Sequence, residues 1–387
     1  MSGLLIELRI RLVRVGHWLG SRLPLRRRVV LATAHAERIG GNLVAIRDEI
    51  TRRHPGVDIV VVAHRPGTGV AGRLRAAVRA LVAGYHLARA RLFIVDDYYF
   101  PIYVVRPRRG TTIVQVWHAS GAFKKMGHSL AGKTFGADAA LTGRVRIHAN
   151  YDLCLISSTN VLPFYAEAFG LPAERFVAHL GIPRTDLFFN AHAVATASAE
   201  VRRRYRLPAG RRVILWAPTF RGERITDARH RDDLDLGVLR HELGEDHVVL
   251  VRRHPFVRAR VRIGPELAGF AFDVSDHPDI HQLMLVGDVL VTDYSSAIFE
   301  FALLGRPMAF FAPDLDAYER ERGFYFDYRT GVPGPIFSET EPLARWLRDG
   351  PVDLERIRRF RDASFEIADG RATARFVEEI ALPALRR

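Results

Sequence analysis

The 387-residue sequence contains one cysteine and only three lysines. The cysteine, Cys154, lies inside an apolar run, so a disulfide framework is excluded and the thiol is expected in a core. No charge-free apolar stretch approaches the roughly 20 residues of a membrane-spanning helix. The amino-terminal segment also lacks the apolar region of a signal peptide, because Glu7, Arg9 and Arg11 interrupt it. These absences place the protein in the cytoplasm.

The sequence lacks the motifs of several enzyme classes at the positions that those classes require. No Gly-x-Gly-x-x-Gly follows the first predicted strand, and no phosphate loop links a predicted strand to a predicted helix. We therefore expect neither a dinucleotide oxidoreductase nor a Walker-type ATPase. No Cys/His cluster has zinc spacing, and the carboxylates form no convincing metal pair. We expect no metal site and no cofactor.

Positive charge is abundant and is almost entirely arginine. There are 57 Lys and Arg against 43 Asp and Glu, which gives a formal net charge of +14. A surplus of this size favours an anionic partner, such as a phosphorylated substrate, acidic lipid headgroups or nucleic acid. A nucleic-acid protein is expected to carry a basic patch with interleaved aromatics. Here the informative polar residues fall singly at the ends of apolar runs, so we expect no nucleic-acid partner. A non-catalytic basic protein that binds nucleic acid or membrane stays an alternative.

Residues 1–28 predict an amphipathic, basic helix. Apolar side chains recur at spacings of three and four, with Trp18 near their border: Leu5, Leu8, Leu12, Val15 and Leu19. Arginines lie beside or opposite this face, and three more follow at 26–28. The pattern is typical of a helix that lies in the interface of an anionic membrane. We expect peripheral attachment to the cytoplasmic face of the cell membrane, and packing of the helix on its own domain is the alternative.

The rest of the chain alternates apolar runs with helical patterns. Strands are predicted at 29–33, 57–64, 91–96, 111–117, 153–157 and 176–180, and again at 212–216, 247–252, 271–274, 289–292 and 308–311. Helices are predicted at 40–53, 73–89, 163–169, 191–204, 234–243, 280–286, 298–304, 342–348, 354–365 and 372–380. This alternation predicts an α/β protein with parallel sheets covered by helices on both faces. We expect two doubly wound, Rossmann-like domains at 29–190 and 205–365, a C-terminal helix at 366–387, and a ligand cleft between the domains.

His118 stands where the apolar run 111–117 stops and a turn with Gly121, Lys124 and Lys125 begins. If that run is a buried parallel strand, its carboxyl end is where ligands meet such a fold. The alternative is a strand-end histidine that is satisfied by a backbone carbonyl and followed by a solvated loop. In the second half, three apolar runs end in polar groups in the same way, at Ala-Pro-Thr-Phe-Arg (217–221), Arg-His-Pro (253–255) and Thr-Asp-Tyr-Ser-Ser (292–296). Three such ends at one predicted sheet edge argue for a site.

The turn at 293–296 is the clearest phosphate candidate. It precedes a helical pattern, whose unpaired N–H groups and partial positive charge favour a phosphate. Ser295 and Ser296 add hydroxyl donors, and the alternative is that one of them is only a helix N-cap. Arg322, beside a glycine and flanked by aromatics, is a further cation for the same cleft.

Six segments in this order resemble the CDP-glycerol glycerophosphotransferase family of teichoic-acid synthesis. They are Trp-His-Ala-Ser-Gly-Ala-Phe-Lys-Lys-Met-Gly (117–127), Gly-Ile-Pro-Arg-Thr-Asp (181–186), Ala-Pro-Thr-Phe-Arg (217–221), His-Pro (254–255), Thr-Asp-Tyr-Ser-Ser (292–296) and Arg-Gly-Phe-Tyr (322–325). The resemblance implies a GT-B-like pair of domains and transfer of glycerol phosphate, or a related alditol phosphate, from CDP-glycerol or another CDP-alditol. The implied acceptor is a hydroxyl of a lipid-linked saccharide, and CMP is released.

By the same resemblance, the donor pyrophosphate site consists of Thr219, Arg221, His254, Ser295, Ser296 and Arg322, and Asp293 and Gly121 support it. His118 faces this site from the other domain and accepts the proton of the attacking hydroxyl, and His254 assists the chemistry. Lys124 and Lys125 are expected to serve an anionic acceptor or the membrane surface.

The Ala-Ser-Gly that follows His118 looks more like the priming members of the family, whereas many polymerising members read Trp-His-Gly. The large additional amino-terminal region of some polymerases is also not seen, so we expect priming. The closest alternative function is a GT-B glycosyltransferase that uses a nucleotide sugar and releases a nucleoside diphosphate.

Overall fold

The computed structural model describes residues 3–64, 69–133, 139–222, 229, 233–254, 257, 261 and 263–386. Within these residues the strands form two sheets of six, in the orders β2-β1-β3-β4-β5-β6 and β12-β11-β10-β7-β8-β9. The strands of the first sheet are β1 (Arg26–Thr33), β2 (Asp58–Ala63), β3 (Ala90–Val95), β4 (Thr112–Gln115), β5 (Leu153–Leu155) and β6 (Phe176–Val177). Those of the second are β7 (Arg212–Trp216), β8 (His247–Val251), β9 (Ala271–Asp273), β10 (Val289–Thr292), β11 (Met308–Phe311) and β12 (Ile336–Phe337).

All pairings between neighbouring strands of the two sheets are parallel. The central strands are buried along their whole length, as in β8, β10 and β11, which is why they read as continuous apolar runs. The predicted α/β class with two Rossmann-like sheets is confirmed.

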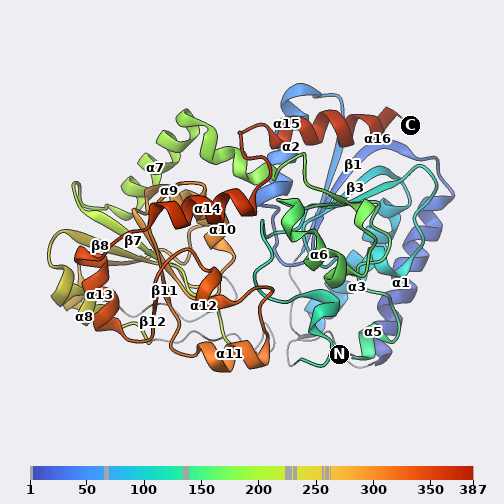
Figure 1. Cartoon of the computed structure of the whole chain (residues 1–387). Coiled ribbons are helices and arrows are strands. Elements are labelled where there is room, and N and C mark those ends of the chain that lie inside the picture. The colour runs from blue at the N-terminus through green and yellow to red at the C-terminus, as the bar shows by residue number, and fades with distance from the viewer. Residues whose placement is uncertain are drawn as a thin grey trace.

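Helices flank both sheets (Figure 1). On the first half they are α1 (Gly3–Ser21), α2 (Gly41–Arg53), α3 (Gly69–Leu87), α4 (Phe100–Val104), α5 (Ala139–Thr142) and α6 (Leu162–Phe169). The 3-10 segment η4 (Pro183–Phe189) and α7 (Ala191–Tyr205) lead to the second half. There the chain forms α8 (Leu236–Leu243), α9 (Ile280–Val286), α10 (Ala297–Ala302), α11 (Leu315–Glu321), α12 (Tyr328–Gly331), α13 (Thr340–Asp349) and α14 (Leu354–Ser364).

The last helices return to the first half of the chain. They are α15 (Ala372–Phe376), η7 (Val377–Ala381) and α16 (Leu382–Arg386), and they lie beside α2 and above β1 in Figure 1. Asp186 of η4 accepts hydrogen bonds of 2.9 and 2.8 Å from the backbone N–H groups of Ala372 and Thr373. Glu378 is paired with Arg53 of α2 at 2.7 Å. The carboxyl-terminal segment follows α14 of the second half and binds residues of the first half. It therefore connects the two halves.

Helix α1 packs on α3 through a face that the sequence pattern did not single out. Its buried residues are Ile6, Ile10, Val13, Gly16 and Gly20. A Cβ on Gly16 would lie 1.9 Å from the carbonyl oxygen of Leu81, so only glycine permits this approach. Most of the predicted apolar face points outward: Leu8 and Trp18 are each 51% exposed, and Val15 and Leu19 are exposed as well. No helix in the described part of the chain is long and apolar enough to cross a membrane.

Candidate active site

The turn after β4 has an unusual backbone that presents His118. Trp117 adopts a φ of 47°, in the left-handed region that non-glycine residues rarely enter. Asn42 of α2 holds the turn by donating hydrogen bonds of 2.9 and 2.8 Å to the carbonyls of Val116 and Trp117. The side chain of Gln115 accepts a bond of 2.9 Å from the N–H of Trp117. Strain that neighbouring side chains maintain is typical of functional sites.

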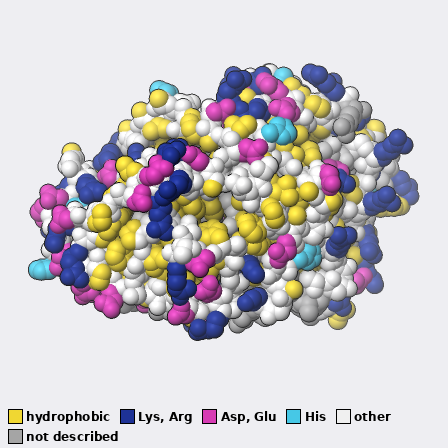
Figure 2. Space-filling view, viewed as in Figure 1, with side chains coloured by type: hydrophobic (Ala, Val, Ile, Leu, Met, Phe, Trp, Pro, Cys, Tyr) yellow, Lys and Arg dark blue, Asp and Glu magenta, His cyan; other side chains and the backbone are white. Residues whose placement is uncertain are grey.

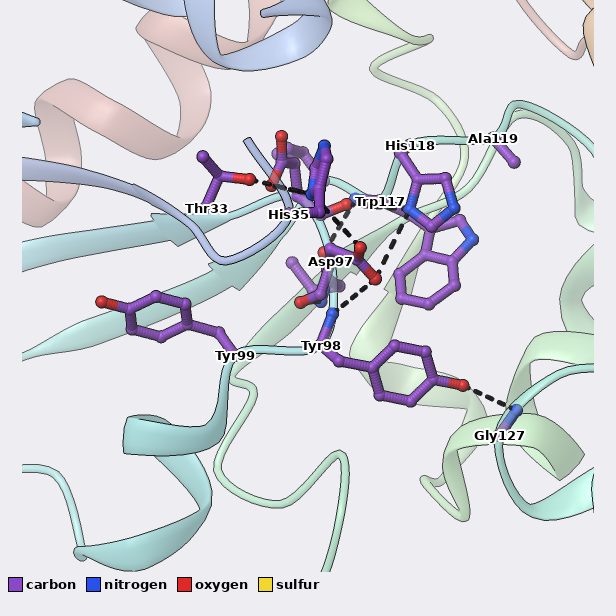
Figure 3. Close-up of polar contacts among 12 residues, drawn as sticks. Thr33, His35, Asp97, Tyr98, Tyr99, Trp117, His118, Ala119 and Gly127 are labelled. Atoms are coloured by element: carbon purple, nitrogen blue, oxygen red, sulfur yellow. Dashed lines mark hydrogen bonds and ion pairs between the residues drawn. The ribbon is translucent and has the colours of Figure 1, made fainter. Parts of the chain in front are cut away.

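The ring of His118 is oriented by its Nδ1 atom, which lies 3.2 Å from the carbonyl oxygen of Asp96 and 3.7 Å from a carboxylate oxygen of Asp97 (Figure 3). A carbonyl can only accept, so Nδ1 carries the proton and the lone pair of the neutral ring is on Nε2. No described residue hydrogen-bonds Nε2, and 46% of the side chain is exposed. Such an imidazole can accept a proton from a substrate.

Burial lowers the pKa of His118 below its usual value, and the positive charges of His35 and Arg184 act in the same direction, whereas Asp97 opposes them. Because the side chain is partly exposed, the role of His118 depends mainly on its open Nε2 atom. A lowered pKa agrees with that role, because the neutral ring is the form that accepts a proton.

Asp97 was not predicted as a site residue. It follows β3 at the same sheet edge as His118, and its carboxylate accepts a bond of 2.7 Å from the N–H of Tyr98. It also lies 3.2 Å from Nδ1 of His35, which follows β1. The two consecutive aspartates directly after a buried strand were the sequence signal that could have identified Asp97 as a site residue.

The turn of His118 contacts α10 in the second half of the chain. Ser120 donates a hydrogen bond of 2.6 Å to Glu300, and Arg184 forms an ion pair with the same carboxylate. Arg184 also donates a bond of 2.6 Å to the carbonyl of His118. A Cβ on Gly121 would lie 2.3 Å from the ring of Phe299, so this glycine is needed for the close approach. Helix α10 is thereby joined to the turn that carries His118.

Two of the six motif segments pair with each other. The N–H of Lys125 donates to the carbonyl of Gly323 at 3.1 Å, and the N–H of Tyr325 donates to the carbonyl of Phe123 at 2.9 Å. The guanidinium of Arg322 lies 3.5 Å from the carbonyl of Lys125. This pairing sets Arg322 at the junction of the two halves, and its role as a cation of the ligand cleft stays a prediction.

Lys124 lies near Asp293, Arg221 and Arg322 of the predicted donor site, and its expected role toward an acceptor or the membrane stays a prediction. Its partly buried ammonium group is within electrostatic reach of Arg322, Asp293 and Arg221. Burial lowers the pKa of Lys124 to about 7, with contributions from the two arginines. A doubly charged phosphate group would relieve this repulsion between cations.

Asp293 organises the ends of β7 and β10. Its carboxylate accepts bonds of 2.8 and 3.0 Å from the N–H and hydroxyl of Thr219, and it pairs with Arg221 at 2.9 Å. Arg221 also binds Asp314 through two bonds of 2.8 and 3.0 Å. Its guanidinium is therefore largely occupied, which favours a supporting role for Arg221, and its contact with the donor phosphates stays a prediction.

Ser295, Ser296 and His254 lie at the same edge of the second sheet. The hydroxyl of Ser295 accepts a bond of 3.2 Å from the N–H of Ala297, and Ser296 precedes α10 with no side-chain cap bond. His254 follows β8, and its ring lies 4.8 Å from that of Phe220. Pro255 of the His-Pro segment lies outside the described residues. The predicted binding of donor phosphates to these groups stays a prediction.

Two strings in the chain match phosphate-binding motifs by letter, Gly-Thr-Gly-Val-Ala-Gly at 67–72 and Gly-His-Ser-Leu-Ala-Gly-Lys-Thr at 127–134. The first lies after β2 and lies partly outside the described residues. The second begins in the short 3-10 segment Gly127–Leu130, which no strand directly precedes, and Gly127 gives its N–H to Tyr98 at 2.9 Å. The described part of this string therefore lacks the strand-to-helix setting of a Walker loop.

Comparison with known proteins identifies the family. The family model for CDP-Glycerol:Poly(glycerophosphate) glycerophosphotransferase matches residues 19–382. The chain belongs to this family. The resemblance seen in the six segments is thereby confirmed, and so is the expectation of an enzyme in the family's transferase class.

Relatives of known function agree with this membership. A teichoic acid ribitol-phosphate primase of Bacillus spizizenii is 35% identical over 365 residues, which cover 94% of this chain and 93% of the primase. A teichoic acid poly(ribitol-phosphate) polymerase of the same species is 34% identical over 364 residues, which cover 93% of this chain but 57% of the polymerase. The structure of the wall teichoic acid polymerase TagF superposes with a TM-score of 0.78 at 22% identity, covering 99% of this chain and 98% of that one. This superposition shows the GT-B-like fold.

Proposed function

We propose that the protein transfers an alditol phosphate from a CDP-activated donor to a hydroxyl of a lipid-linked acceptor and releases CMP. The observation that carries the proposal is the open Nε2 of His118 on a turn that touches α10, the helix that follows Ser295 and Ser296. The contact supports the proposal, because it joins the turn of the proposed proton acceptor to the helix that follows two proposed phosphate-binding serines. Phosphoryl transfer needs mainly such positioning and neutralisation of charge.

In the proposed reaction the acceptor hydroxyl attacks the β-phosphorus of the donor. The new bond joins the acceptor oxygen to that phosphorus, and the bond to the bridging oxygen breaks, so that CMP leaves with the bonding electrons. The hydroxyl proton passes to Nε2 of His118, and Asp97 stabilises the resulting imidazolium. Arg322, Lys124 and His254 neutralise the pyrophosphate and the leaving group.

We further propose that the protein primes a polymer. The Ala-Ser-Gly after His118 supports this proposal, as does the match to a teichoic acid ribitol-phosphate primase over 93% of that protein's length. The residues proposed to bind phosphate suit glycerol phosphate, ribitol phosphate and related alditol phosphates alike.

The deciding experiment is incubation of the protein with CDP-glycerol, CDP-ribitol and other CDP-alditols together with lipid-linked saccharide acceptors. CMP release and product mass are scored together. We expect CMP release with at least one donor and addition of a single alditol phosphate to the acceptor. Release of a nucleoside diphosphate from nucleotide sugars would identify a glycosyltransferase instead, and absence of CMP from every donor would refute the proposal.

We also propose that α1 attaches the protein to an anionic membrane surface. The outward side chains of Leu4, Leu8, Val15, Trp18 and Leu19 supply apolar area, and the neighbouring helix α3 exposes Leu74 and Val78. Exposed arginines accompany them at Arg11, Arg14, Arg22, Arg26 and Arg27. Figure 2 shows basic side chains along the right-hand edge of the molecule, where α1 lies in Figure 1. Apolar side chains and arginines together bind anionic interfaces.

A further inference from the structure

His35 lies just beyond β1 and has the same kind of environment as His118. Its Nδ1 is 2.9 Å from the hydroxyl oxygen of Thr33 and 3.2 Å from a carboxylate oxygen of Asp97. The carboxylate can only accept, so Nδ1 carries a proton. No described residue hydrogen-bonds Nε2 of His35, and 33% of the side chain is exposed. The ring is thus fixed on one side and open on the other.

Asp97 is shared between the two histidines. One of its carboxylate oxygens faces His118 and the other faces His35, and the two ring centroids are 6.1 Å apart. Figure 3 shows both rings converging on this carboxylate from the ends of different strands. A histidine that served only to hold Asp97 would need no open face beside the proposed base.

The charges around the two rings differ. His35 faces Asp96 and Asp97, with Thr33 from its own strand and His118 as the other neighbours. Burial alone would lower the pKa of His35, but the two aspartates outweigh it and raise the pKa. His118 faces Asp97, His35 and Arg184, and burial lowers its pKa. Neighbouring groups whose pKa values move in opposite directions are the usual sign of divided acid and base roles.

We propose that His35 is a second functional histidine of this site, whose positively charged ring donates an Nε2–H hydrogen bond to a phosphate oxygen of a substrate beside His118. The proposal rests on the proposed phosphotransferase function. Reacting atoms must come within about 3–3.5 Å of each other. A hydroxyl bound to His118 therefore brings phosphate oxygens near a ring whose centroid lies 6.1 Å away. The oxygen belongs either to the transferred phosphoryl group of the donor or to a phosphodiester of the acceptor.

The pH dependence of kcat/KM for the acceptor tests the proposal, measured at saturating CDP-alditol so that the bound pyrophosphate keeps Lys124 charged. Neutral His118 is needed, so the rate falls on the acid side as His118 becomes protonated. Protonated His35 is needed, so the rate also falls on the alkaline side as His35 loses its proton, at a pH above the usual histidine pKa of about 6.5. The His35→Gln variant should lose this alkaline limb and lower kcat/KM roughly 10- to 100-fold, the range for a hydrogen bond to a charged group.

Two further variants separate this role from a structural one. The His35→Lys variant keeps a positive charge, so it should recover part of the rate and move the alkaline limb to higher pH. His179→Gln is the matched control, because His179 pairs with Glu379 at 3.2 Å on the carboxyl-terminal helices, away from Asp97. If His35→Gln does not fold, His35→Asn takes its place in the same measurements.

The outcomes are distinct. A larger KM for the CDP-alditol in His35→Gln identifies the donor phosphoryl group, and a larger KM for the acceptor identifies the acceptor phosphodiester. A wild-type protein that releases CMP, with a His35→Gln variant of unchanged rate and unchanged pH profile, would overturn this inference alone. A wild-type protein that releases no CMP from any donor would overturn the proposed function, and this inference with it.

Discussion

Ser120 donates a hydrogen bond of 2.6 Å to the carboxylate of Glu300, across the junction between the two halves of the chain. Burial alone would raise the pKa of Glu300, but Arg184, His281 and Ser120 outweigh it and lower the pKa, so the group is held as a carboxylate. The turn of His118 and the helix after Ser295 and Ser296 are therefore one connected unit. Displacement of either one should disturb the alignment of base and donor.

We predict that Ser120→Ala lowers kcat and destabilises the fold by about 1.5–3 kcal/mol, because the buried carboxylate loses a hydrogen bond. The donor residues are untouched, so the Kd for a CDP-alditol should change little. Denaturant unfolding and single-turnover rates measure the two effects. Thr111→Val is the matched control, since it removes a hydroxyl bond of 2.9 Å to Ala90 just before β4, at the opposite end of that strand from His118. Equal losses of kcat in both variants would contradict a special role for the junction.

We predict that His118→Ala lowers kcat by roughly 10²–10⁴-fold, the usual contribution of a general base. Donor affinity should survive, because the proposed phosphate-binding groups come from the other sheet and from the Lys124 and Arg322 segments. Calorimetry with a CDP-alditol measures the donor Kd, and a CMP-release assay measures kcat. A near-normal kcat in this variant would show that another group accepts the proton.

Much of the fold could be predicted because buried parallel strands are continuous apolar runs. The bounds of β7, β10 and β11 match the predictions residue for residue. The edge strand β12 (Ile336–Phe337) was missed because two residues carry no periodicity, and α11 (Leu315–Glu321) was missed because its pattern is mostly charged. The outward face of α1 was predicted, but its packing through Gly16 on α3 depends on a contact that no local pattern encodes.

Residues of the candidate site could be predicted where they directly follow a strand. They could not be predicted where their position depends on contact between distant parts of the chain. His118, Asp293 and His254 each follow an apolar run, so the sheet edge could be inferred. The bond between Ser120 and Glu300 joins residues 180 positions apart. A lone glutamate in the apolar pattern at 297–302 was the signal that could have identified it. The sharing of Asp97 by two histidines likewise arises only when β1, β3 and β4 lie side by side.

We predict that Arg322→Ala and His254→Ala both weaken donor binding and slow the chemistry, because each removes a positive or hydrogen-bonding group from the proposed pyrophosphate site. A loss of roughly tenfold or more in affinity is expected for a charge-assisted contact with phosphate. Titration with CDP-glycerol measures it. Unchanged affinity in both variants would refute the phosphate-site assignment.

We predict that the Leu8→Glu and Trp18→Glu substitutions together release the protein from anionic vesicles. Each exposed side chain that enters a membrane interface contributes about 1.5–3 kcal/mol, so the partition coefficient should fall by tenfold or more. Sedimentation with phosphatidylglycerol vesicles, compared with phosphatidylcholine vesicles, measures this. Leu354→Glu is the matched control, since Leu354 is 56% exposed at the start of α14. Equal release by the control would argue against a specific role for α1.

We predict that donor binding takes up a proton at Lys124. The pKa of this group is about 7 in the free protein, so above that pH the amine is mostly neutral. A pyrophosphate beside it favours the ammonium form and raises the pKa, so binding at pH 8 should draw a proton from solution. Affinity should then weaken by up to about tenfold for each pH unit above 7 and level off below pH 6, where Lys124 is already charged. Calorimetry in buffers of different ionisation enthalpy measures the number of protons taken up on binding.

The Lys124→Met variant should lose this uptake, whereas Lys133→Met should keep it. Lys133 is the matched control because it is exposed and bonded only weakly to the carbonyl of Arg320, at 3.3 Å. Uptake that persists in Lys124→Met would assign the proton to another group, and His254 would be the first to examine.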